Sequence, residues 1–201
     1  MPKRVDHEQR RAEIAEAVLR IASTRGIHAA SMREVAAEAG VSLRLVQYYF
    51  HTKEELMVGS MAHLTTRMDA RLRERIRAAG LPPTPRSVLY AALPGMIPTD
   101  EEMYRIQLTY VAFQGLMISD PTLATKHFGT GPNLLESYLA SQIKLAQDNG
   151  EIPADHDPSL TATTLVALTG GLAVSVVAGQ RDGESAQRVV LDYLDRLFTT
   201  S

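Results

Sequence analysis

Apolar residues recur every three or four positions along most of the chain, the spacing typical of amphipathic helices. The first predicted helix covers residues 7–25 and ends at Gly26, a residue type that commonly terminates helices. Its apolar stripe consists of Ile14, Ala17, Val18, Ile21 and Ala22. No convincing strand or hairpin signal appears, so the pattern predicts an all-α fold.

Hydroxyl side chains indicate where the next helices begin, because Ser and Thr cap free backbone N–H groups at helix N-termini. Ser31 with Glu34, and Thr52 with Glu55, have the spacing of a capping box. Ser42 is placed to cap a short helix between them. The helices predicted in this region cover residues 32–39, 42–50 and 52–79.

The proline-rich run over residues 81–85 interrupts the helical pattern and is expected to separate the long helix from those that follow. Thr99 with Glu102 predicts another capping box, and Gly129 to Pro132 should kink or split a helix that begins at Asp120-Pro121. The predicted helices begin near residues 84, 99, 120, 157 and 184, and they end near residues 95, 119, 150, 179 and 198.

Composition excludes several protein classes. The chain has 201 residues, of which 45% are hydrophobic, so it is long and apolar enough to bury a core. It has no cysteine, which excludes disulfides and thiolate metal sites. The six histidines show no metal-ligand spacing, and no cofactor is expected. No apolar run approaches a membrane span and no signal-peptide core is visible, so we expect a cytoplasmic protein without a membrane partner.

The formal net charge of -2 conceals an asymmetry. Residues 1–77 carry 14 Lys and Arg against 10 Asp and Glu, a net charge of +4. Residues 78–201 carry 7 against 13, a net charge of -6. A basic segment joined to an acidic one is expected when only one end of a protein meets phosphate.

The helix over 32–39, the turn at Gly40-Val41 and the helix over 42–50 have helix-turn-helix spacing. At about 100° per residue, the second helix places Val46, Tyr49 and Phe50 on one side. Its other side is free of carboxylates, which suits the negative major groove of DNA. That side consists of Arg44, Gln47, Tyr48 and His51.

Two runs carry a specific family resemblance: SMREVAAEAGVS over residues 31–42 and VQYYFHTKEEL over residues 46–56. They resemble the DNA-binding domain of TetR-family transcriptional regulators over about residues 8–60. The chain departs from the usual pattern at Arg44-Leu45, where the family often has Gly-Thr, and at Gln47, where it often has Tyr. The resemblance implies a DNA-binding domain over residues 1–60, with its motif at about 32–51, and a regulatory and dimerisation domain over 61–201.

The residues expected to bind DNA divide into two roles. Arg44 and Gln47 have the donors and acceptors that read base edges. Arg33 is expected to touch a base or a phosphate, and the residues expected to contact phosphates are Ser31, Ser42, Tyr48, His51 and Lys53. The basic residues Lys3, Arg4, Arg10 and Arg11 form either an arm along the DNA or a solvated surface. The full predicted set is Ser31, Arg33, Ser42, Leu43, Arg44, Gln47, Tyr48, Tyr49, His51 and Lys53.

The resemblance also implies a homodimer that binds a palindromic operator and a small-molecule inducer of unknown identity. The candidate ligand residues are Met103, Tyr104, Tyr110, Phe113, Gln114, Met117, Phe128 and Tyr138. The candidate dimer interface is Leu135, Leu139, Leu165, Gly170, Gly171, Val174 and Ala178, with Leu134, Ile143 and Leu145 in the same helices.

Two alternatives stay open on the sequence alone. One is a DNA-binding protein without an inducer, and the other is an all-α enzyme whose helix-turn-helix spacing is coincidental. A second basic run, Arg67 to Arg77, is interpreted as a solvated helix face, because Glu74 lies three residues from both Arg71 and Arg77.

Overall fold

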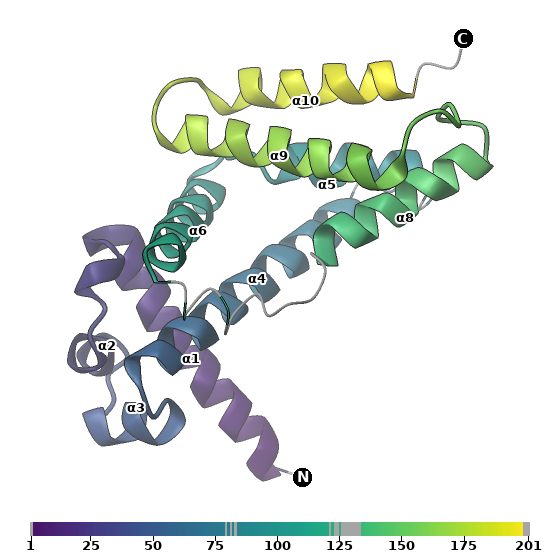
Figure 1. Cartoon of the computed structure of the whole chain (residues 1–201). Helices are drawn as coiled ribbons and strands as arrows, with labels where there is room; N and C mark the ends of the chain where they lie inside the picture. The colour runs from purple at the N-terminus through teal and green to yellow at the C-terminus, as the bar shows by residue number, and fades with distance from the viewer. Residues whose placement is uncertain are drawn as a thin grey trace. The chain divides into compact units, whose positions relative to one another are not determined.

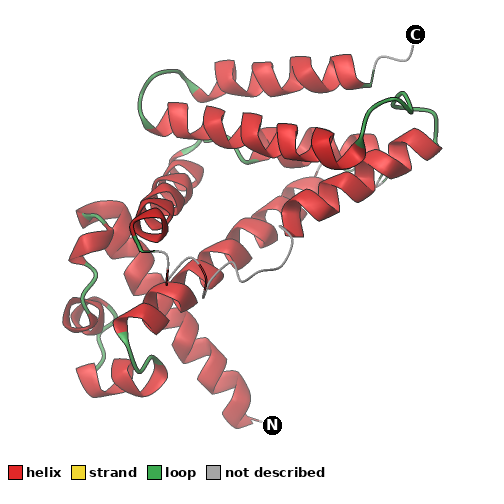
Figure 2. Ribbon diagram, viewed as in Figure 1, coloured by secondary structure: helices red, strands yellow, loops and turns green. Residues whose placement is uncertain are grey.

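The computed structural model describes residues 2–78, 80, 82, 84–120, 122, 125 and 134–198, with side chains from residue 7 onward. These residues form helices joined by loops and contain no strand (Figure 2), which confirms the all-α prediction. The chain divides into two compact units, one from residues 1–68 and 108–130 and the other from residues 69–107 and 131–201. Helices α4 (Lys53–Ala78) and α6 (Glu101–Ser119) contribute residues to both.

The first unit begins with four helical elements, labelled in Figure 1 apart from the short 3-10 helix. They are α1 (Pro2–Arg25), the 3-10 helix η1 (Ile27–Ala29), α2 (Met32–Glu38) and α3 (Leu43–Tyr49). The predicted apolar stripe of α1 is buried throughout, which confirms its assignment. Gly26 and Gly40 have φ of +82° and +66°, a left-handed backbone that favours glycine where each preceding helix ends.

The first unit closes around the start of α4. Phe50, which follows α3, is 1% exposed, and the turn that holds it lies beside α4. A β-carbon on Gly59 of α4 would lie 2.6 Å from the Phe50 ring, so only glycine lets the two approach this closely. Burial of Leu56, Met61 and Leu64 continues this apolar face along α4. The core therefore holds the C-terminal end of α3 in place.

The second unit packs α5 (Pro85–Gly95), α8 (Leu134–Asp148), α9 (Pro158–Val177) and α10 (Gly183–Leu197) around one apolar core. Helix α9 lies against α8, and α10 contacts both α9 and α5 (Figure 1). The side chains of this core include Leu89, Leu93, Leu139, Ile143, Leu165, Leu172, Val190 and Leu194.

The helix starts test the predicted caps. Thr84 forms a capping box with Ser87, and the Asp157 carboxylate accepts the backbone N–H of Leu160 at 2.9 Å, as the predicted starts require. The cap predicted at Thr99 is wrong by one residue, because the Asp100 carboxylate accepts the Met103 N–H at 2.8 Å. Of the helix predicted from Asp120-Pro121, the first part and the break at 129–132 lie almost wholly outside the described residues. The part predicted to resume and end near residue 150 corresponds to α8, which ends at Asp148.

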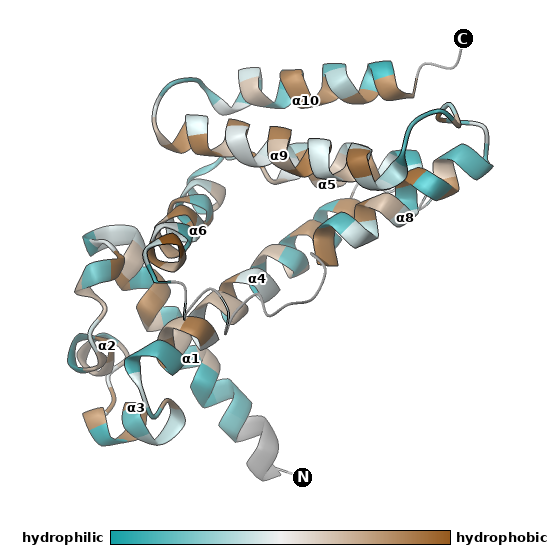
Figure 3. Cartoon of the chain, viewed as in Figure 1, coloured by the Kyte–Doolittle hydropathy of each residue, from teal (hydrophilic) through white to brown (hydrophobic). Residues whose placement is uncertain are grey.

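Helix α9 corrects the expectation that no apolar segment of the chain approaches a membrane span. Its 20 residues include no charged side chain, and by length and composition the helix is apolar enough to cross a membrane. Threonine, serine and glycine interrupt its apolar run, which hid this property in the sequence. Figure 3 shows α9 coloured mainly white to brown. Its inner face, with Thr169 and Leu165 at 0% exposure, packs in the core, while Leu160 and Val174 remain exposed.

Candidate nucleic-acid interface

The helix-turn-helix is set by two serine caps. The Ser31 hydroxyl accepts the Glu34 N–H at 3.2 Å and begins α2, and the Ser42 hydroxyl accepts the Leu45 N–H at 3.2 Å and begins α3. Each cap satisfies a backbone donor that the helix itself leaves free. With Gly40 turning the chain between them, both helices begin where the sequence predicts.

Helix α3 has one buried and one exposed face, as its sequence predicts. Val46 is fully buried, while Arg44 and Gln47 are exposed and Tyr48 is 62% exposed. His51, which follows on the same face, is also exposed. Helix α3 itself contains no carboxylate, so this exposed face offers donors, acceptors and an aromatic ring without repelling phosphate.

The remaining predicted DNA-binding residues surround α3. Ser31, Arg33, Ser42 and Lys53 are exposed, and Leu43 is half-buried. Thr52 caps α4 by accepting the Glu55 N–H at 3.1 Å, while the Glu55 carboxylate reaches back to the His51 N–H at the same distance. The backbone donors at the start of α4 are therefore partly satisfied within the chain.

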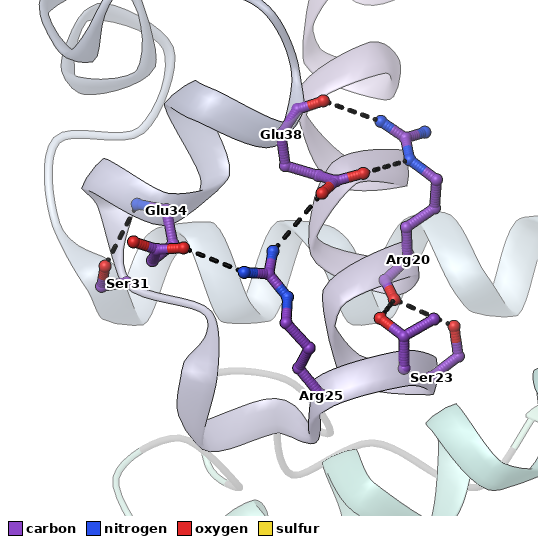
Figure 4. A network of polar contacts seen from close by, with 7 residues as sticks. Arg20, Ser23, Arg25, Ser31, Glu34 and Glu38 are labelled. Atoms are coloured by element: carbon purple, nitrogen blue, oxygen red, sulfur yellow. Dashed lines mark hydrogen bonds and ion pairs between the residues drawn. The ribbon is translucent and has the colours of Figure 1, made fainter.

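Helix α2 is fastened to α1 by a network of exposed ion pairs, drawn in Figure 4. Arg20 of α1 donates to the Glu38 carboxylate at 2.8 Å, and Arg25 contacts Glu34 at 3.0 Å and Glu38 at 3.4 Å. The Glu34 carboxylate pairs with Arg25, and the Ser31 N–H donates to the Ala29 carbonyl at 2.9 Å, so only half of the predicted capping box forms. Single exposed pairs contribute little, but three that share residues restrain the helix orientation.

Two of the basic residues considered for an arm have other partners. Arg10 pairs with Glu13 at 2.6 Å. The Arg11 side chain donates to the Tyr49 carbonyl at 2.5 Å, and its guanidinium lies 4.3 Å from the centre of the Phe50 ring. Neither of the two alternatives describes Arg11, which holds the C-terminal end of α3 against α1. No spacing signal identifies such a contact, because 38 residues separate its partners.

Tyr49 is half-buried: it lies on the same side of the helix as Val46 and Phe50, and it is also one of the predicted DNA-binding residues. Its ring lies 5.2 Å from that of Tyr48 and 4.6 Å from the ring of His7 on α1, measured between ring centres. The sequence analysis did not select His7. Its proximity to the α3 face emerges only in the folded unit.

The second basic run on α4 is paired with carboxylates. Arg71 bridges Asp100 and Glu102, Arg73 pairs with Asp69, and Arg77 with Glu74. Arg67 contacts Glu16 of α1 at 2.9 Å. Arg73, Glu74 and Arg77 are exposed, as the interpretation of a solvated helix face requires, whereas Arg71 is half-buried.

The candidate ligand residues of α6 differ in burial. Met103, Phe113 and Met117 are buried, and the half-buried Gln114 amide donates to the Tyr110 hydroxyl at 2.7 Å. Gln107, which the sequence analysis did not select, is only 4% exposed.

The remaining ligand candidates are Tyr104, Tyr138 and Phe128. The hydroxyl of Tyr104, a partly exposed residue, donates to the Val177 carbonyl at 3.2 Å, and its side chain borders a shallow hollow beside Gly183. Tyr138 on α8 is 46% exposed. Phe128 lies outside the described residues.

The predicted dimer residues separate into core and surface. Leu139, Ile143 and Leu165 are fully buried within their own unit, so their assignment to an interface is wrong. They are apolar like the exposed residues of the same helices, and the sequence alone does not tell the two sets apart. Leu135 and Gly170 are half-buried. The exposed residues of this set are Leu134, Leu145, Gly171, Val174 and Ala178.

Two family models match the chain. The model described as bacterial regulatory proteins of the tetR family matches residues 14–58, which include the whole motif. The model described as the C-terminal domain of BetI-type transcriptional repressors matches residues 85–199, more than half of the chain.

Individual proteins agree with these models. The transcriptional regulator PksA of Bacillus subtilis is 29% identical over 98% of this chain and 94% of its own length. BetI of Pseudomonas paraeruginosa is 29% identical over 98% of this chain and 96% of its own length.

Solved structures share the fold. A TetR-family regulator from Rhodococcus matches with a TM-score of 0.82 and 26% identity, over 96% of this chain and all of that one. A regulator from Saccharomonospora viridis in complex with choline matches with a TM-score of 0.76 and 19% identity, over 96% of this chain and all of that one. The family models exclude the enzyme alternative. The chain belongs to the TetR family and is a helix-turn-helix transcriptional regulator, with the C-terminal domain of the ligand-responsive BetI-type repressors.

Proposed function

We propose that this regulator is a cytoplasmic homodimeric repressor that binds a palindromic operator and leaves it when a small molecule binds. The observation that carries the proposal is the exposed, carboxylate-free face of α3. One such helix reads too few base pairs for operator-level specificity, so two copies are needed. A two-fold symmetric protein then requires a palindromic site.

The side chains of α3 and of the residues around it have two roles in DNA recognition, base contact and phosphate contact. Arg44 and Gln47 read base edges, since Arg forms paired hydrogen bonds with guanine and Gln with adenine. The surrounding polar residues contact phosphates and set the register; they are Ser31, Ser42, Tyr48, His51 and Lys53. Arg33 contacts a base or a phosphate. Phosphate contacts raise affinity for all sequences alike and make it fall with salt.

An uncharged surface on α9 supports a dimer. Its exposed residues recur at three- or four-residue intervals, which places them on one face of the helix. They are Ser159, Leu160, Thr163, Thr164, Ala167, Gly171 and Val174, followed by Ala178 directly after the helix. Helix α8, packed beside α9, exposes Leu134 and Tyr138. Two copies of this pair of helices would form a self-complementary four-helix interface and cover the apolar residues.

The ligand is proposed to bind along α6. Residues Met103, Gln107, Tyr110, Gln114 and Met117 follow one another at three- or four-residue spacing, so they form a single row on the helix. The row combines adaptable methionines with neutral polar groups and carries no charge, which suits a mainly apolar molecule with a few polar atoms. Choline, found in the Saccharomonospora regulator, adds a quaternary ammonium as a second test compound.

Selection of bound fragments from a random DNA pool tests the operator. We expect a palindrome whose two half-sites lie about one helical turn apart, 10–10.5 base pairs, or somewhat more. Enrichment of a single non-repeated element would contradict the dimer, and the absence of any enriched sequence would contradict specific recognition.

Titration of the purified operator complex tests the inducer. Uncharged aromatic compounds and choline are added separately, and DNA release is followed by fluorescence anisotropy. Gln114→Leu should weaken release by the active compound, whereas Gly115→Ala, an exposed neighbour with open space around its β-carbon, should not. Release at wild-type concentrations in Gln114→Leu would place the ligand elsewhere. If no compound releases the DNA, the alternative without an inducer becomes the better description.

A further inference from the structure

The C-terminal end of α3 receives a hydrogen bond from another helix. The Arg11 guanidinium of α1 donates to the carbonyl of Tyr49, the last residue of α3, at 2.5 Å. The last carbonyls of a helix have no partner within the helix, and they carry the negative end of its dipole. A charged donor therefore stabilises this end more strongly than a neutral one.

The same guanidinium contacts the ring that seats the end of α3. It lies 4.3 Å from the centre of the Phe50 ring, and Phe50 is only 1% exposed. A second contact comes from α4, where a β-carbon on Gly59 would lie 2.6 Å from the ring. The Phe50 backbone has left the helical conformation, with φ of -136° and ψ of 102°, so α3 ends at this point. Arg11 therefore holds both the last carbonyl of α3 and the side chain that follows it.

The short length of α3 makes the contacts at its end important for its direction. The helix has seven residues, about two turns, and its middle is fixed by Val46, which is fully buried. A second fixed point at the end of the helix defines the direction of its axis. The exposed Arg44 and Gln47 side chains extend from this helix, so their positions depend on that direction.

We propose that Arg11 is a positioning residue for DNA recognition, which fixes the direction of α3 and thereby determines sequence specificity without contacting DNA. This inference rests on the proposed role of Arg44 and Gln47 in reading bases. Paired hydrogen bonds with a base edge form only within narrow limits of distance and angle. Phosphate contacts carry no sequence information, so affinity for unrelated DNA depends much less on the direction of α3. Loss of Arg11 therefore lowers affinity for the operator more than affinity for unrelated DNA.

The test is the ratio of affinity for the selected operator to affinity for a scrambled duplex of the same length, measured by fluorescence anisotropy. Arg11→Met keeps an unbranched side chain but removes the guanidinium. Arg10→Met is the matched control, because it removes the same charge from the adjacent exposed position, where Arg10 pairs with Glu13 of its own helix. Unfolded protein lowers the apparent affinity for both duplexes alike, so a purely structural role leaves the ratio unchanged.

We expect Arg11→Met to lower the ratio by about fivefold or more, the size that one hydrogen bond to a charged group produces. Arg10→Met should keep the wild-type ratio, and the two variants should share the same salt dependence. An equal fall for both duplexes in Arg11→Met, with a smaller salt slope than in Arg10→Met, would make Arg11 a phosphate contact and overturn the proposal.

Gly59→Ala separates positioning from a direct base contact by Arg11. It displaces the Phe50 ring from the side of α4 and removes no charge or donor. We expect it to lower the ratio as well, and the double variant with Arg11→Met to lose less than the product of the two single losses, because both act through Phe50. Circular dichroism checks that each variant is folded. Single losses that multiply would assign Arg11 a base contact of its own and overturn the proposal. Equal affinity of the wild-type protein for the two duplexes would instead overturn the proposed function of α3.

Discussion

The side chains of α3 and of Phe50, which follows it, are buried or exposed according to the face on which they lie. Val46 and Phe50 are buried and determine how the helix is seated, whereas Arg44 and Gln47 lie in solvent. Substitution of the exposed pair removes little packing, so it separates recognition from stability. The same holds for Lys53 in the first turn of α4, which is exposed.

Arg44→Ala and Gln47→Ala should each weaken operator binding by about 1–3 kcal/mol, through the loss of one base contact per half-site. On operator variants in which the contacted base pair has been replaced, the same substitutions should cost less. Lys53→Ala should weaken all sequences alike and reduce the salt slope by about one contact per protomer. Binding to a panel of single-base operator variants at several salt concentrations measures both. Unaltered sequence preference in both Arg44→Ala and Gln47→Ala would mean that another surface reads the bases.

At the scale of elements, the last helix of the second unit is fastened at both ends. At its start, a β-carbon on Gly183 would lie 1.9 Å from the Pro98 carbonyl oxygen, so this close approach requires glycine. At its end, the Tyr90 hydroxyl of α5 donates to the Asp195 carboxylate at 2.6 Å. Arg86 lies over both the Tyr90 and Phe198 rings. These contacts align α10 with α5 along the core.

The Tyr90 contact predicts a stability change at high pH. Burial, followed by the Asp195 carboxylate, raises the pKa of the Tyr90 phenol above its ordinary value. The neutral phenol therefore favours the folded state; its contribution is complete below the unfolded pKa of about 10 and is lost as the pH rises through the folded value.

Tyr90→Phe should cost about 1 kcal/mol at pH 8, the net value of one hydrogen bond, and this difference should shrink above pH 10. Urea unfolding at pH 8 and pH 11 measures it. Tyr193→Phe on α10 serves as the control because its ring lies outside this cluster. A Tyr90→Phe difference that stays constant with pH would argue against the assigned role.

At the scale of the whole molecule, the exposed face of α9 leaves apolar side chains in contact with solvent in a single chain. Leu160 is 70% exposed and Leu134 of α8 is 82% exposed, although both are large and apolar. Isolated exposed leucines are common, but this face is uncharged along the length of α9. A second copy of the chain satisfies both the apolar surface and the need for two reading helices.

Gly171→Trp tests this assembly. A β-carbon on Gly171 meets no atom within 4 Å, so the substituted chain should fold and keep its helical circular dichroism. Light scattering should then show monomers, and operator affinity should fall by at least about tenfold, or 1.4 kcal/mol. Val189→Trp, on the exposed side of α10, should remain dimeric. A dimeric Gly171→Trp with full operator binding would exclude this face.

The sequence by itself determined the helices and most of their starts. Helix periodicity and caps arise from residues three or four positions apart, so Ser31, Ser42 and Asp157 were correctly placed without knowledge of the fold. Asp100 shows the limit of this approach, because Thr99 has an equally suitable spacing and the true cap depends on which side chain turns toward the helix. The exposed face of α3 was predictable for the same local reason.

Only the tertiary structure decided which apolar residues form the core and which remain on the surface. Leu139 and Leu134 lie in the same helix and have the same chemistry, yet one is fully buried and the other is 82% exposed, because the neighbouring α9 covers only one side of α8. Arg11 and His7 reach α3 across about 40 residues of sequence. Such contacts depend on how helices pack, and the spacing of residues along the chain carries no record of them.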